Sequence, residues 1–322
     1  MHQKAFQMMW QSKGSNMLRV ENLTKKFEEK IAVNQISFTV KPGVITGLLG
    51  PNGAGKTTTM RLISGFLSPT SGTVTYSNFG IDTDLKEIQS RLGYLPETAA
   101  LYSDMLVLEY LEYIARIRGV EEGLISSRVN KMIELCELST HLKIPISFLS
   151  KGFKQRVALA GTLVHDPELI ILDEPTSGLD PNQISHIRQL IKSLGKDRTL
   201  ILSTHILQEV EDICDEVIII NGGTIVANST VKGLHRGNSM YVSVRGDEKT
   251  VLPKLKSLFL LAEKLETEEE QDGFIPYILG LGDKNPQDVF SILKKSEFEI
   301  REIKVYKKSL ETIFEELTRG AK

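Results

Sequence analysis

The stretch Gly50–Thr57 constrains this chain most, because its glycine-rich pattern works only between a strand and a helix. It reads Gly-Pro-Asn-Gly-Ala-Gly-Lys-Thr and fits G-x-x-x-x-G-K-[ST] at every specified position. The apolar run Val44–Leu49 precedes it, and the helix-like Thr58–Ile63 follows it. This order predicts a loop whose backbone N–H groups surround the phosphates of a nucleotide. A chance glycine-rich turn is the alternative, and strand and helix in register make it improbable.

The residue types in the loop suit a nucleotide bound with Mg²⁺. Gly53 and Gly55 let the backbone approach phosphate without Cβ atoms in the way. Lys56 places an ammonium between the β- and γ-phosphates, and Thr57 offers a hydroxyl to the metal. The free N–H groups at the start of the helix add partial positive charge.

Size and composition limit the remaining possibilities. A chain of 322 residues is long for one domain and comfortable for two. Apolar content of 41%, charged content of 25% and a formal charge of −2 describe an ordinary globular chain with no general attraction to nucleic acid. Cys136 and Cys214 lack metal-ligand spacing, which favours buried free thiols in a reducing compartment.

The chain has no apolar run near the roughly 18 residues that span a bilayer, so a membrane role requires another chain. Residues Met1–Asn16 lack the apolar core of a secretory signal, and we expect a flexible extension there. Patterned sequence begins at Met17. Leu18–Leu23 and Gln35–Val40 alternate as strands of an antiparallel pair, joined by a polar turn over Thr24–Lys30. Taken alone, Phe27 in that turn is better explained by packing than by stacking on a purine.

Helical periodicity over Met105–Leu142 predicts a helical insert, which we place at about residues 98–165. Near its end, Ser150 is suited to cap a helix that starts Lys151-Gly152-Phe153. The N–H groups near Gly152 form a second potential anion site, and an ordinary capped amphipathic helix is the alternative.

Two polar clusters follow buried strands. The continuous apolar run Leu169–Leu172 ends in Asp173-Glu174, and carboxylates at that position are costly unless a cation or a proton-accepting role occupies them. Thr199–Ser203 is a similar strand, followed by His205. The parallel arrangement predicts that His205, Asp173 and Gly50 share one sheet edge.

The sequence changes character after Gly233, following a hairpin predicted at Asn221-Gly222-Gly223. We predict an accessory α+β domain over 237–322, with the nucleotide domain over 17–236. The expected order of elements in the accessory domain is βαββαβ plus a final helix, which is a ferredoxin-like arrangement. The predicted elements are Met240–Val244, Val251–Leu261, a weak strand at Leu265–Gln271, Phe274–Leu279, Pro286–Lys295, Phe298–Tyr306 and Leu310–Leu317.

Together these motifs resemble the ATP-binding subunit of an ABC transporter, over about Leu18–Val231. The resemblance implies an α/β P-loop NTPase of ABC type, with a mixed sheet core, an antiparallel β subdomain and a helical insert. It makes Phe27 the adenine-stacking aromatic, Leu149–Phe153 the signature, Leu169–Glu174 Walker B with the catalytic Glu174, Ser177–Asp180 the D-loop and His205 the switch histidine. It assigns ATP binding to Phe27, Asn52, Gly53, Ala54, Gly55, Lys56, Thr57, Thr58, Ser150, Gly152 and Asp180.

Three residues depart from the family pattern. Glu97 stands where most members have a glutamine, so a carboxylate would contact Mg²⁺ or water there. Lys151 replaces a signature glycine and Phe153 a glutamine, leaving Ser150 and Gly152 as the phosphate contacts. Similar variations occur in bacterial exporter ATPases of the drug-resistance, sodium-export and gliding-motility types.

The resemblance also implies a mechanism. Two copies, or one copy and a paralogous ATPase, would sandwich two ATP molecules head to tail. Thr57, Asp173 and Glu97 would hold the metal, Glu174 would polarise the attacking water, and Lys56 and His205 would contact the γ-phosphate. A separate membrane-spanning permease would receive the motion, placing this chain on the cytoplasmic face of the inner membrane.

Two other classes of protein compete with this interpretation. ABC ATPases of chromosome, repair or translation type lack a membrane partner, but they carry a long coiled coil or two cassettes, and this chain has neither pattern. A GTPase or small-molecule kinase would leave the Ser150 segment without a role, and the guanine-reading Asn-Lys-x-Asp is missing. For the accessory domain, a structural or dimer-supporting role is favoured over regulator binding.

Overall fold

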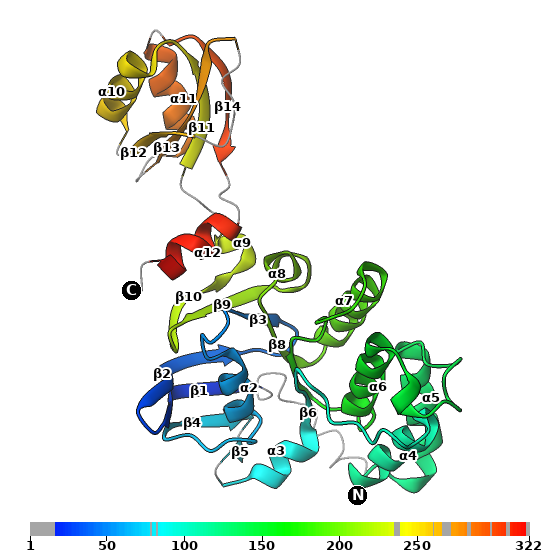
Figure 1. Cartoon of the computed structure of the whole chain (residues 1–322). Coiled ribbons are helices and arrows are strands. Elements are labelled where there is room, and N and C mark those ends of the chain that lie inside the picture. The colour runs from blue at the N-terminus through cyan, green and yellow to red at the C-terminus, as the bar shows by residue number, and fades with distance from the viewer. Residues whose placement is uncertain are drawn as a thin grey trace, which may run out of the picture. The chain divides into compact units, whose positions relative to one another are not determined.

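The computed structural model forms two compact units (Figure 1). The first runs to Val231 and includes the end of the chain from Glu316, and the second is Lys232–Glu315. The sequence predicts an accessory domain over 237–322, whereas the second unit begins at Lys232 and the end of the chain from Glu316 belongs to the first unit. There, Nδ2 of Asn221 donates to the carbonyl oxygen of Thr318 at 3.0 Å. The structure describes residues 17–77, 79–81, 83–234, 239–259, 261–265, 272–281, 285–296, 298–306 and 310–319, and the predicted extension Met1–Asn16 lies outside them.

A six-stranded sheet of order β10-β9-β3-β8-β7-β6 is the centre of the first unit. The strands from β9 to β6 are parallel, and β10 closes the edge as an antiparallel hairpin partner of β9. The predicted apolar runs form β3, β7 and β8, which are buried along their whole length because helices or a second sheet cover both faces. The strands are β3 (Ile45–Leu49), β6 (Leu92–Leu95), β7 (Leu169–Asp173), β8 (Thr199–Thr204), β9 (Glu216–Asn221) and β10 (Thr224–Thr230).

A second sheet of order β2-β1-β4-β5 covers helix α2 (Lys56–Ile63) from the other side. Met60, Leu62 and Ile63 of α2 lie in one apolar core with residues of both sheets. The strands are β1 (Leu18–Phe27), β2 (Lys30–Val40), β4 (Ser71–Tyr76) and β5 (Phe79–Gly80).

The first hairpin differs from our prediction. We expected a turn over Thr24–Lys30, but β1 continues to Phe27 and only Glu28-Glu29 turn, with Glu28 at a positive φ of 48°. Polar residues stay in the strand there because this end of the hairpin is exposed and needs no apolar face.

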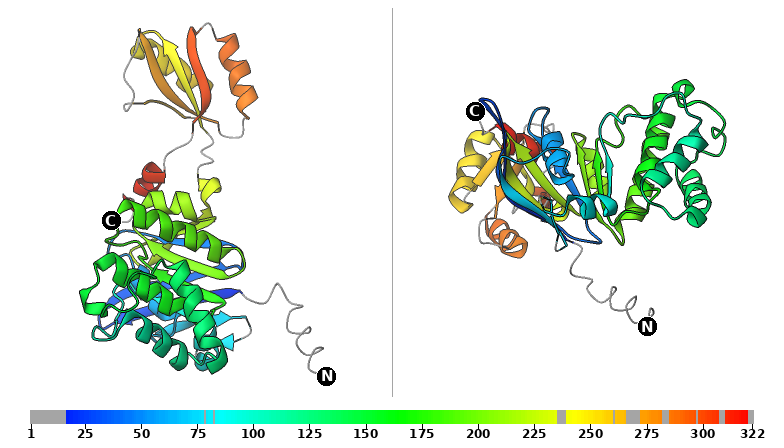
Figure 2. Two further views of the ribbon diagram at one scale, coloured as in Figure 1. Left: turned by 90° about the vertical axis from the view of Figure 1, so that its right-hand side faces the viewer. Right: turned by 90° about the horizontal axis from the view of Figure 1, so that it is seen from below.

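The predicted helical insert is present, and its helices group together at one end of the first unit (Figure 2). Helices α4 to α6 pack on one another. On the central sheet, α7 and α8 pack against β8. The bounds are α3 (Leu85–Arg91), α4 (Val107–Ile117), α5 (Glu122–Leu135), a 3₁₀ turn at Ile146–Phe148, α6 (Lys151–Leu163), α7 (Pro181–Gly195), α8 (Leu207–Ile213) and α9 (Val231–Leu234).

The second unit has the predicted ferredoxin-like order, with an antiparallel sheet β12-β13-β11-β14. The strand β12 lies at Leu261–Lys264, before the predicted strand Leu265–Gln271, of which residues 266–271 lie outside the described ones. The four residues of β12 are too few for an alternation of apolar and polar residues to show the strand in the sequence. The other elements are β11 (Ser239–Arg245), α10 (Glu248–Leu258), β13 (Phe274–Gly280), α11 (Pro286–Lys295) and β14 (Ile300–Tyr306). The last helix, α12 (Leu310–Arg319), begins in the second unit and ends in the first.

Candidate functional site

The register of the parallel strands brings the predicted polar clusters to one sheet edge. Leu49 pairs with Thr204, and Asp173 pairs with Ser203, so the glycine-rich loop, Glu174 and His205 all follow strands that end side by side. A hollow of about 560 Å³ opens there. It is lined by Phe27, Lys30, Ala32, Asn52, Gly53, Gly55, Lys56, Thr57, Thr58, Glu97, Glu174 and His205.

The glycine-rich loop uses its glycines for backbone conformation and for clearance. Gly53 has a φ of 80° and Gly55 a φ of 109°, both in the region that side chains disfavour. A Cβ on Gly55 would lie 2.6 Å from the carbonyl oxygen of Ala32. Gly55 is therefore required by the protein's own backbone, in addition to the predicted approach of phosphate.

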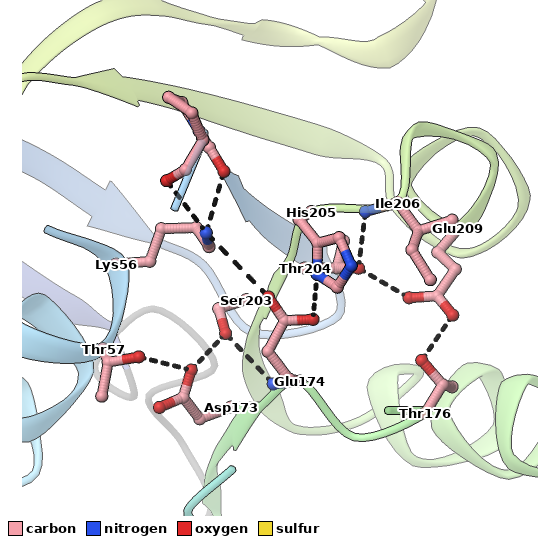
Figure 3. Close-up of polar contacts among 12 residues, drawn as sticks. Lys56, Thr57, Asp173, Glu174, Thr176, Ser203, Thr204, His205, Ile206 and Glu209 are labelled. Atoms are coloured by element: carbon pink, nitrogen blue, oxygen red, sulfur yellow. Dashed lines mark hydrogen bonds and ion pairs between the residues drawn. The ribbon is translucent and has the colours of Figure 1, made fainter. Parts of the chain in front are cut away.

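The ammonium group of Lys56 is held inside the loop that precedes it. Nζ donates to the carbonyl oxygens of Gly50 at 2.8 Å and Pro51 at 3.3 Å, and it lies 3.9 Å from Oε1 of Glu174 (Figure 3). The side chain is buried, so the charge faces the hollow with little screening by water. An anion in the hollow would meet a fixed positive charge.

Asp173 is fully buried beneath the loop and is only partly satisfied. Its Oδ1 accepts hydrogen bonds from the hydroxyls of Ser203 and, at 3.4 Å, Thr57. Its Oδ2 has no hydrogen-bond partner among the described residues. Burial raises the pKa of this carboxyl, and the nearby charge of Glu97 adds to the effect. A cation at Oδ2 would offset both.

Glu174 lies between two nitrogen groups, those of Lys56 and His205. Its Oε2 is 2.8 Å from Nδ1 of His205, while its backbone N–H donates to the carbonyl oxygen of Ser203 at 3.2 Å and to its hydroxyl at 3.1 Å. Its φ of 50° is unusual for a glutamate and is typical of residues held at functional sites. Burial raises the pKa of Glu174, and the hydrogen bond from His205 opposes that rise. A carboxylate with a raised pKa that faces a hollow is a candidate proton acceptor.

Phe27 and Glu97 both line the hollow. The ring of Phe27 is 45% exposed, and Nζ of Lys25 lies 5.2 Å from its centroid. One face of that ring is available for a flat ligand. Glu97 follows β6 and is exposed at the rim.

Ser150, Gly152 and Asp180 do not line the hollow as the described part of this chain forms it. Ser150 caps α6 as predicted, accepting the N–H of Phe153 at 3.3 Å, and Asp180 caps α7, accepting the N–H of Gln183 at 2.9 Å. A Cβ on Gly152 would lie 2.2 Å from Oε1 of Gln183. The signature segment thus packs on the D-loop helix of the same chain.

Sequence reasoning missed Ser203, Lys30 and Ala32. The Ser203 hydroxyl donates to the carboxyl of Asp173 and accepts the backbone N–H of Glu174. The only sign of this in the sequence is a polar residue at the end of an apolar strand. Lys30 and Ala32 enter the hollow because β2 passes beside the loop, and no local pattern shows that.

Comparison with known proteins identifies the family. The family model described as ABC transporter matches residues 33–177. The bacitracin transport ATP-binding protein BcrA of Bacillus licheniformis is 32% identical over 311 residues, which cover 95% of this chain and 98% of that protein. The chain is an ABC transporter ATP-binding subunit.

Other relatives agree with this assignment. The Nod factor export ATP-binding protein I of Ralstonia nicotianae is 35% identical over 79% of each chain. A bacterial ABC transporter cassette solved as a dimer aligns with a TM-score of 0.62 and 25% identity, over 66% of this chain and 98% of that one. The predicted α/β P-loop fold and ATPase class of the ABC subunit are thereby confirmed. Within the described residues, no helix is both long and apolar enough to cross a bilayer.

Proposed function

We propose that two copies of this subunit, or one copy and a paralogous ATPase, close head to tail around two ATP molecules. The observation that carries the proposal is that the hollow holds the loop, Glu174 and His205, while Ser150 and Gly152 lie elsewhere on the chain. A second copy would complete the site with these two residues. The solved structure of a related cassette as a dimer supports this arrangement.

The proposed reaction is attack of water on the γ-phosphate, in line with the leaving oxygen. Glu174 orients the water and accepts its proton, which its raised pKa favours. Lys56 and His205 stabilise the charge on the γ-phosphate, and the fixed position of Lys56 means that little reorganisation is needed. Phe27 stacks on the adenine.

The residues beside the loop fit a Mg²⁺ ion. Oδ2 of buried Asp173 lacks a partner among the described atoms, and the Thr57 hydroxyl lies beside the same carboxyl. In the described part of the chain, no three His, Cys, Asp or Glu side chains could hold a metal by themselves. Mg²⁺ is commonly bound through one or two carboxylates together with substrate phosphates. Asp173 and Thr57 would hold it, with Glu97 as a third ligand, and the ion would neutralise phosphate charge.

We further propose that the subunit drives export through a separate membrane-spanning permease, on the cytoplasmic face of the inner membrane. The name of the Nod factor export ATP-binding protein I supports export, and that of the bacitracin transport ATP-binding protein BcrA supports transport. The second unit has its own apolar core, and we assign it a structural or dimer-supporting role.

Cross-linking between differently tagged copies tests the head-to-tail arrangement. One copy carries Lys30→Cys, at the hollow, and the other Phe148→Cys, which is 81% exposed and two residues before Ser150. The native thiols stay silent because both are buried, which raises the pKa of Cys136 to about 12 and also raises that of Cys214.

Both copies also carry Glu174→Gln to slow hydrolysis. A bismaleimide should join the two cysteines, giving a product that carries both tags, only when ATP and Mg²⁺ are present. Copies that both carry Lys30→Cys, or both Phe148→Cys, are the matched controls. Absence of the mixed product across linker lengths would reject the head-to-tail dimer. Purification of the intact complex from membranes would identify the permease.

A further inference from the structure

The carboxyl group of Glu209, in α8, is fully buried between two hydroxyls from different strand ends (Figure 3). Its Oε2 accepts a hydrogen bond of 2.7 Å from Oγ1 of Thr204, the last residue of β8. Its Oε1 accepts a hydrogen bond from Oγ1 of Thr176, which follows β7. Burying a carboxyl is costly unless such bonds replace those made to water, so both hydroxyls are needed where they are.

The Thr204 bond fixes the backbone that carries His205. The Thr204 hydroxyl donates to Glu209 and also accepts the N–H of Ile206 at 3.1 Å, so it spans the His205 peptide. Because Nδ1 of His205 is 2.8 Å from Glu174, a shift of this backbone would break that contact.

The Thr176 bond fixes the start of the D-loop. Thr176 lies two residues after Glu174, and its carbonyl oxygen accepts the N–H of Leu179 at 3.2 Å. The carbonyl oxygen of Glu174 accepts the N–H of Ser177 at 3.1 Å. Glu209 therefore joins the segment after the catalytic glutamate to the segment that carries the histidine.

We propose that Glu209 is a positioning residue for ATP hydrolysis, which holds His205 and the D-loop in a fixed relation to Glu174 through two threonine hydroxyls. The proposal rests on the roles given above to Glu174 and His205. Catalytic groups must stay within roughly 0.5 Å of their productive positions, and hydrogen bonds from neighbouring residues are a common means of holding them there.

A purely structural role is the alternative. Nη2 of Arg188 lies 3.9 Å from Oε1 of Glu209, and its Nη1 is 2.6 Å from Oδ2 of Asp212. In that case the carboxyl only joins α7 to α8, and the threonine hydroxyls contribute nothing to turnover. The two roles differ in what the hydroxyls do.

Paired substitutions at the threonines in the full chain separate the two roles. Valine keeps the shape of threonine and removes the hydroxyl, while serine keeps the hydroxyl and removes the methyl group. We expect Thr204→Val and Thr176→Val each to lower kcat roughly tenfold, with unchanged affinity for a fluorescent ATP analogue. Thr204→Ser and Thr176→Ser should keep kcat within about twofold of the unmodified chain.

Variants of α8 complete the test. Glu209→Gln should lower kcat as the valine variants do, and Asp212→Asn, the same change on the same helix, should leave it unchanged. Rates are divided by the fraction of sites that bind nucleotide, so unfolded protein does not count. Valine variants as fast as the unmodified chain would overturn the proposal, as would serine variants as slow as the valine ones. Full turnover by Glu174→Gln would instead reject the proposed catalytic roles themselves.

Discussion

The Nδ1 atom of His205 lies 2.8 Å from Oε2 of Glu174, although 31 residues separate the two in the chain. The contact exists because β7 and β8 are neighbouring parallel strands that end in register. A carboxyl of raised pKa thus meets an imidazole at the mouth of the hollow. Because His205 lowers the pKa of Glu174 through this contact, replacing either residue should change the ATPase reaction in a measurable way.

Replacing Glu174 by glutamine should slow ATP turnover and leave ATP binding intact. The amide keeps the size of the side chain but cannot accept a proton, so we expect kcat to fall roughly 10²- to 10⁴-fold. The ATP-bound dimer should accumulate in size-exclusion chromatography. Glu112→Gln, on the surface of α4, is the control and should change neither quantity. Unchanged steady-state turnover would reject Glu174 as the proton acceptor.

Loss of His205 should move the acid limb of the pH–rate profile to higher pH. Burial raises the pKa of Glu174, and His205 lowers it through its hydrogen bond and charge. A base acts when deprotonated, so turnover is lost as the pH falls through its pKa. In His205→Gln that pKa is higher, and activity should be lost at a higher pH than in the unmodified chain. His186→Gln, on α7, should keep the original profile; a limb that stays in place or moves down in His205→Gln would contradict the coupling.

Neutralising Asp173 should stabilise the nucleotide-free protein while preventing Mg²⁺-dependent turnover. Burial raises the pKa of this carboxyl, so the native state favours its protonated form and loses stability as the pH rises through that pKa. Asp173→Asn removes the cost, which we place on the order of 1 kcal/mol, or about 2–4 °C in Tm.

The comparison is a thermal melt with EDTA at neutral and at acid pH. The gain of Asp173→Asn should shrink at acid pH, where the carboxyl of the unmodified chain is protonated. Asp104→Asn, at an exposed carboxyl, serves as the control. A Tm lower than that of the unmodified chain at neutral pH would show that the carboxylate is well accommodated without a metal.

Removing the ring of Phe27 should weaken ATP binding without harming the fold. The ring is 45% exposed beside the hollow, and loss of a base–aromatic stack costs about 1–3 kcal/mol, so Kd should rise at least about fivefold. Ile31→Ala is a matched control, since Ile31 is 48% exposed and lies on the same hairpin. Equal affinities for Phe27→Ala and Ile31→Ala by equilibrium titration would argue that the ring does not contact the base.

A chain that ends at Val231 should still bind ATP, because the residues that line the hollow all precede that position. Dimer formation by the Glu174→Gln form of this truncation should be altered if the second unit supports the dimer. Sedimentation velocity with ATP measures the change. A folded truncation that fails to bind nucleotide would contradict the expectation that ATP binding does not need the second unit. Dimerisation identical to that of the full chain would show that the second unit is dispensable for the dimer.

The nucleotide loop, the buried strands and the helical insert could be predicted from the sequence. The pattern Gly50–Thr57, the apolar run Leu169–Leu172 and the cap at Ser150 are local signals, because each depends on residues within a few positions of one another. β12 was misplaced because its four residues carry too short a pattern.

By itself the sequence determined where the glycine-rich loop lies and which strands are buried, since steric freedom of glycine and apolar periodicity act over short distances. Only the tertiary structure decided that the Ser203 hydroxyl bonds to Asp173 and Glu174, and that Glu209 lies between Thr176 and Thr204. Those contacts depend on strand register and on how α8 packs on the sheet. Hydrogen bonds have short reach and strict geometry, so a shift of one residue in register would remove them.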